Sequence, residues 1–151
     1  MNNIKELERL IEEMLLWGKE VSTSMNDGPL QLEKQLVKLY HLYFDLPDLS
    51  DDSDYSHPPV FPNSYEETLK LNFPNFGYYN VCLNPKGLLT QYENGVGDAT
   101  DDIRDILREL WDIDFYFKHT TPENAIFYFK LAFYSHLRFH VKNLLFYIEE
   151  Q

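Results

Sequence analysis

The sequence predicts a mainly all-α protein, folded as one compact bundle of about five helices over residues 1–151. Three observations predict it: long stretches carry apolar residues every three or four positions, strand-like alternation is confined to one short segment, and the chain is long enough to bury a core. Aromatic residues make up 16% of the chain, so much of that core should be built from rings.

The first two helices are predicted at residues 3–21 and 29–44. In the first, apolar residues at three- and four-residue spacing face lysines and glutamates on the opposite side, which is the pattern of an amphipathic helix. Asn26-Asp27-Gly28 ends it, and Pro29 suits the first turn of the next helix. Pro47 stops the second helix.

The middle of the chain is less regular. A short helix is predicted at residues 64–73, followed by an extended segment around residues 79–83 that could form an edge strand. Asn94-Gly95 and Gly97 are expected to form a turn or a flexible loop.

The last two helices have the clearest periodicity. They are predicted at about residues 100–118 and 121–149, and the second begins with a cap at Thr121 followed by Pro122. Because about three residues separate them, the two helices should form an antiparallel hairpin.

A long acidic loop is expected at residues 45–63. It contains four prolines and five aspartates without any period, and it exceeds the usual length of a connection. It is interpreted as either a binding loop or a family-specific insertion. The spacing of its aspartates is not that of an EF-hand, and the central glycine is missing, so calcium binding is not expected.

The charge balance limits the kinds of partner. Thirteen Lys and Arg against 25 Asp and Glu give a net charge of −12, which disfavours nucleic acid and anionic membrane surfaces. A basic partner protein is favoured instead. The lone Cys82, the charged beginning of the chain and the absence of a long apolar run suggest a cytoplasmic protein.

Two histidines on the last predicted helix are the main candidates for chemistry. His136 and His140 are four residues apart, on a stripe expected to point inward: Ile126, Phe129, Phe133, His136, His140, Leu144 and Tyr147. An acidic flank on the preceding helix could reach them: Asp98, Asp101, Asp102, Asp105, Glu109 and Asp112.

This pairing has two interpretations. A pair of histidines with carboxylates from a facing helix can hold a divalent metal ion. The candidate ligands are His136, His140, Asp101, Asp102 and Asp105. The preferred interpretation is a structural cluster, in which buried imidazoles find hydrogen-bond partners, since a buried polar group without one costs about 1–3 kcal/mol.

Several short motifs resemble those of the bacterial family called "domain of unknown function 5063", mainly over residues 65–148. They are Phe73-Pro74, Gly77-Tyr78-Tyr79, Val81, Asn84-Pro85, Gly97-Asp98, the run from Asp101 to Ile106, Leu110, Phe133, Ser135-His136 and Arg138-Phe139-His140. The resemblance implies a helical cytoplasmic protein of unassigned activity, and its motifs include the acidic helix and the histidine pair.

Two functions follow from these patterns. The first is a non-enzymatic acidic interaction module that binds a partner protein and needs no cofactor, since no phosphate loop, dinucleotide fingerprint or nucleophile elbow is present. The alternative is a metal-binding helical-bundle domain with a His/Asp site between the last two helices. As a hydrolase, it would use one carboxylate as general base on a bound water.

Overall fold

The chain is mainly α-helical, as predicted, in a computed structural model that describes residues 2–23, 27–50, 54–88 and 93–150. Its elements are α1 (Asn2–Lys19), α2 (Gly28–Asp45), α3 (Ser64–Asn72), β1 (Tyr78–Cys82), β2 (Asn94–Asp98), α4 (Ala99–His119), α5 (Pro122–Ala132), the π-helical turn η2 (Phe133–Leu137) and α6 (Arg138–Glu149). None of the helices in these ranges combines the length and the apolar character that crossing a bilayer requires.

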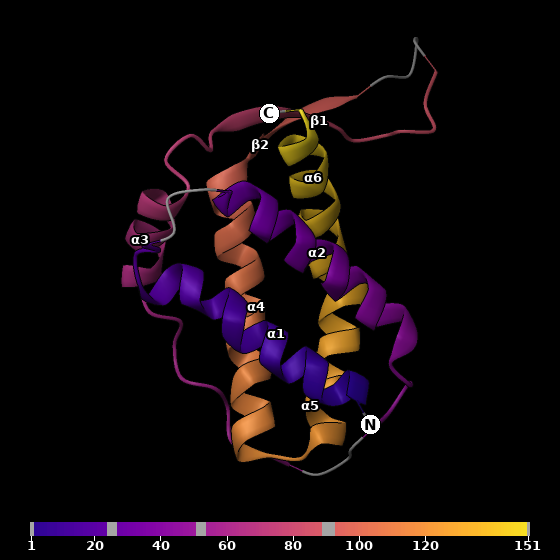
Figure 1. The fold of residues 1–151 in the computed structure, drawn as a ribbon. Coiled ribbons are helices and arrows are strands. Elements are labelled where there is room, and N and C mark those ends of the chain that lie inside the picture. Colours follow the sequence, from indigo (N-terminus) through magenta and orange to yellow (C-terminus); the bar gives the residue numbers. More distant parts are fainter. Residues whose placement is uncertain (1, 24–26, 51–53, 89–92, 151) are drawn as a thin grey trace.

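Two layers of helices enclose the core. Helix α4 lies antiparallel to the continuous rod of α5, η2 and α6, and α1 and α2 cross this pair (Figure 1). The Thr121 hydroxyl caps the rod by accepting a hydrogen bond from the Asn124 N–H at 3.1 Å, and Pro122 follows it. The short predicted connection therefore produces the predicted helix hairpin. Leucines of α1 and α2 and the rings of Phe129 and Phe133 fill the space between the layers.

A small antiparallel sheet lies beyond one end of the helix pair (Figure 1). The predicted extended segment forms β1, with Tyr79 opposite Gly97 and Val81 opposite Gly95. The expectation of a turn or flexible loop at Asn94-Gly95 and Gly97 is wrong, because these residues form β2. Glycine suits this strand for a steric reason: a Cβ on Gly97 would lie 2.5 Å from Cζ of Tyr79.

The described part of the acidic loop is attached to the helices along its second half. Trp111 of α4 donates its indole N–H to the carbonyl oxygen of Pro59 at 2.9 Å. The ring of Phe61 packs edge-on against Tyr65 and Trp111. Residues 58–63 therefore lie against α4 and form one wall of a groove, and residues 51–53 lie outside the described residues.

The contact between α1 and α3 depends on Gly18. A Cβ at this position would lie 2.4 Å from Cδ2 of Tyr65, whose buried ring is itself held between Phe61 and Trp111. We expect Gly18→Ala to lower the free energy of unfolding by about 1–2 kcal/mol, because overpacking outweighs the better helix propensity of alanine. Urea denaturation followed by far-UV circular dichroism measures this change.

Gly77→Ala is the control for this prediction, since a Cβ there meets nothing within 4 Å. Equal stabilities for Gly18→Ala and the unmodified protein would show that Tyr65 moves aside freely.

Candidate metal centre

Asp102 anchors a polar cluster between the last two helices. It lies in the first turn of α4, where the helix dipole favours a negative charge, and its side chain is only 8% exposed. The N-terminus of the helix is set by Asp98, whose carboxylate accepts a hydrogen bond from the Thr100 N–H at 2.9 Å. The buried Asp102 carboxylate accepts one hydrogen bond from the Tyr79 hydroxyl and one from the His140 ring. Both of its oxygens are therefore satisfied.

The imidazole of His140 is held in one orientation. Its Nδ1 lies 2.7 Å from Oδ1 of Asp102, and because a carboxylate can only accept, this nitrogen carries the proton. The hydrogen bond to Asp102 raises the pKa of His140, with smaller contributions from the charges of Asp105 and Glu109, against the opposing effect of burial. The other ring nitrogen, Nε2, is directed at His136.

The two imidazoles meet nitrogen to nitrogen. Nε2 of His140 lies 3.1 Å from Nε2 of His136, and the rings are nearly perpendicular. Nδ1 of His136 lies 3.2 Å from Oε1 of Glu109, so this carboxylate favours a proton on that nitrogen. Both rings then present Nε2 lone pairs to each other. A positive species between the two nitrogens, either a proton or a metal ion, relieves their repulsion.

The inward orientation predicted for both histidines is correct only for His140. Its side chain is 13% exposed, whereas that of His136 is 49% exposed. The reason is the π-helical turn η2, which lengthens the spacing of the buried face to four residues. Leu137, rather than His136, faces the core. π-Helical turns within α-helices are frequent at functional sites.

The three predicted acidic ligands, Asp101, Asp102 and Asp105, lie in three different places relative to the histidines. Asp105 approaches the cluster, with Oδ2 3.6 Å from Nε2 of His140, whereas Asp102 binds the far side of that ring and cannot reach the same nitrogen. Asp101 does not join the histidines as predicted; it is half exposed and forms an ion pair with Arg104 at 3.1 Å. Asp101 and Asp102 are adjacent in the helix, so their side chains point about 100° apart around its axis.

Two nitrogen atoms, one from each histidine, are already placed to bind a shared ion. Within the described ranges, no group of three or more His, Cys, Asp or Glu side chains is arranged to hold a metal ion. The convergent donors are the Nε2 atoms of His136 and His140, and the nearest further oxygen is that of Asp105.

Tyr79, which lies in the predicted extended segment, also belongs to the cluster. It comes from β1, and its ring packs on Tyr147 of α6. Burial and the hydrogen bond to Asp102 raise the pKa of its hydroxyl, so the group stays a donor. Gly97 lies opposite Tyr79 only once β1 and β2 pair, and it then leaves room for the ring.

Comparison with known proteins shows the fold and nothing further. No family model and no curated protein matches the chain. A crystal structure of protein BF1032 from Bacteroides fragilis, a structural genomics target, is similar with a TM-score of 0.68. The match has 15% sequence identity and covers 98% of this chain and 90% of that one. The resemblance to the "domain of unknown function 5063" family stays a prediction.

Asp102 should control the protonation of His140. We expect Asp102→Asn to lower the pKa of His140, because the hydrogen bond to the carboxylate is the largest of the effects that raise it and burial opposes them. An NMR titration of the ring protons measures the change.

The raised pKa of His140 in the unmodified protein also makes its stability depend on pH. Since the folded-state pKa of His140 is raised, its contribution is fully present below about pH 6.5 and is lost as the pH rises through that raised value. Asp102→Asn should therefore destabilise the protein more at pH 6 than at pH 9. A pKa of His140 unchanged in the variant would contradict the assigned hydrogen bond.

Gly97 should be needed to keep Tyr79 on Asp102. A Cβ there would meet Cζ and the hydroxyl oxygen of Tyr79 at 2.5 and 2.8 Å, so Gly97→Ala must displace the ring. We expect a loss of about 1–3 kcal/mol in thermal or urea unfolding, since Asp102 then loses a buried hydrogen bond. Gly95→Ala is the matched control in the same strand, because its Cβ meets only the tip of the exposed Leu83 at 3.3 Å. Equal losses in both variants would argue against a specific role for Tyr79.

Proposed function

We propose that the protein binds one divalent transition-metal ion between His136 and His140. The observation that supports this proposal is the 3.1 Å separation of the two Nε2 atoms, with the Nδ1 of each ring beside a carboxylate. Two nitrogens that each lie about 2.1 Å from one ion are roughly 3.0–3.4 Å apart, depending on the angle between the bonds. The two imidazoles therefore already have the spacing of ligands on a single metal ion.

The carboxylates around the rings support the same function. Metal-bound histidines commonly donate their second N–H to a carboxylate, which fixes the tautomer and increases the basicity of the ligand nitrogen. Asp102 and Glu109 occupy these positions for His140 and His136. Asp105 could supply a third ligand by a small side-chain rotation, since its Oδ2 is 3.6 Å from Nε2 of His140.

The proposed site is open on one side. His136 is half exposed, so a metal ion could enter from solvent and water could complete its coordination. Two imidazoles and one carboxylate suit zinc, nickel, iron or manganese better than calcium or magnesium. With Asp105 as a third ligand and exchangeable water, the site would have the composition of catalytic rather than structural zinc sites.

Isothermal titration of chelator-treated protein with Zn²⁺, Ni²⁺ and Mn²⁺ at pH 8 tests the proposal. One saturable equivalent is expected for at least one of these ions. His136→Ala should weaken it at least about 100-fold, because loss of a ligand should cost more than the 10–100-fold typical of its outer partners. Because His136 is half exposed, the variant should keep its fold. Asp102→Asn should weaken binding by roughly 10-fold.

His41→Ala is the matched control. His41 also faces a carboxylate one helical turn away, Asp45 at 2.8 Å, but it lies on the exposed side of α2 without a second imidazole. Metal binding unaffected by His136→Ala, or equally weakened by His41→Ala, would show that the many surface carboxylates bind the ion. No saturable binding would mean that the histidine pair takes up only a proton.

A second function, binding of a basic partner protein, is supported by the net charge of −12 and by a groove between the acidic loop and α4.

A further inference from the structure

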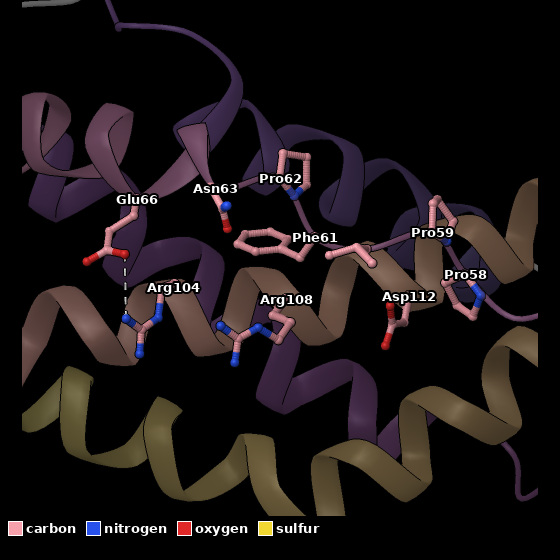
Figure 2. A pocket seen from close by; sticks show the side chains of 10 residues that line it. Pro58, Pro59, Phe61, Pro62, Asn63, Glu66, Arg104, Arg108 and Asp112 are labelled. Carbon is pink, nitrogen blue, oxygen red and sulfur yellow. Dashed lines mark ion pairs between the residues drawn. The ribbon is translucent and has the colours of Figure 1, made fainter.

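A groove of about 420 Å³ lies between the proline-rich end of the acidic loop and α4. Figure 2 shows its two walls, with Pro58, Pro59 and Phe61 on the loop and Arg104, Arg108 and Asp112 on the helix. We call it the proline groove. The indole hydrogen bond from Trp111 to the Pro59 carbonyl holds the loop wall against the helix.

The two arginines of the groove are already neutralised. Arg104 forms ion pairs with Asp101, Asp105 and Glu66 at 3.1–3.7 Å, and the pair with Glu66 is drawn in Figure 2. Arg108 lies 3.5 Å from Asp105, and its guanidinium is 5.8 Å from the centre of the Phe61 ring. An anionic ligand would have to compete with these carboxylates, so the groove does not favour anions.

Asp112, at the other end of the groove, has no such partner. Among the described residues, none donates a hydrogen bond to its carboxylate or forms an ion pair with it, although it is partly buried. Burial, together with the charge of the neighbouring Glu109, raises its pKa to about 6, and the charge of Arg108 only partly opposes this. A partly buried carboxylate without a cation gains free energy when one arrives.

We propose that the proline groove receives the side chain of a lysine or arginine from a basic partner protein. The cationic head would pair with Asp112, and the aliphatic stem would lie against Pro58 and Pro59. Charge complementarity supports this occupant twice: locally through the unpaired carboxylate, and over the whole chain through a net charge of −12, which would attract a basic partner. The stem of a lysine or arginine can cover apolar surface while its charged head stays hydrated or paired. This inference is independent of metal binding at the histidines.

The test uses blocked five-residue peptides of glycine and alanine with one central lysine, arginine, norleucine or glutamate. Each is titrated into ¹⁵N-labelled protein, and binding is followed by the indole N–H resonance of Trp111, which reports directly on the loop wall. The lysine and arginine peptides should give saturable shifts there, weakened by added salt. The norleucine and glutamate peptides should not.

Asp112→Asn should weaken binding of the cationic peptides about tenfold or more, the loss expected when a charge-assisted hydrogen bond is removed. The variant should stay folded, because asparagine removes a partly buried charge at neutral pH. Glu149→Gln is the matched control, since it removes one negative charge from the exposed end of α6. Equal losses in the two variants, equal binding of the norleucine peptide, or no saturable shift at Trp111 would each overturn the proposal.

Discussion

The buried carboxylate of Asp102 is the interaction on which the polar centre of this protein depends. A buried charge is costly unless it is paired and hydrogen-bonded, and Asp102 receives hydrogen bonds from Tyr79 of β1 and His140 of α6 while it lies at the start of α4. One side chain therefore joins three segments that are far apart in the chain. The position of the small sheet over the end of the helix pair follows from this connection together with the contacts of the Tyr147 ring with Phe76 and Tyr79.

The orientation of the histidine pair follows from the same carboxylate. With Nδ1 of His140 committed to Asp102, only Nε2 is left to face outward, and the π-helical turn brings Nε2 of His136 to meet it. Asp102 and His140, on the inner side of the cluster, are held in place because they are buried and hydrogen-bonded. The outer half, at His136, is open to solvent. A fixed His140 beside a solvent-accessible His136 suits the metal binding proposed above, since the ion could enter from solvent.

Helix α4 contributes side chains to two chemically different sites. Its carboxylates at Asp102, Asp105 and Glu109 surround the histidines, and Asp112, two turns after Asp105, lines the proline groove. Asp105 belongs to both, since it lies 3.6 Å from Nε2 of His140 and 3.5 Å from both Arg104 and Arg108. The negative charge of the chain is thus locally balanced by arginine in the middle of the helix and left unbalanced at Asp112.

The sequence by itself determined the helices, the helix hairpin and the meeting of acidic groups with histidines, because three- and four-residue apolar spacing and a short connection are local properties. Only the tertiary structure decided which acids take part. A turn of π-helix, which apolar spacing does not distinguish from α-helix, exposed His136 and buried Leu137. Likewise, β2 and the place of Tyr79 depend on contacts between residues distant in the chain. In the sequence, Gly97 indicated a turn or a flexible loop. In the fold, it lies opposite Tyr79, and its missing side chain leaves the space that the tyrosine ring occupies.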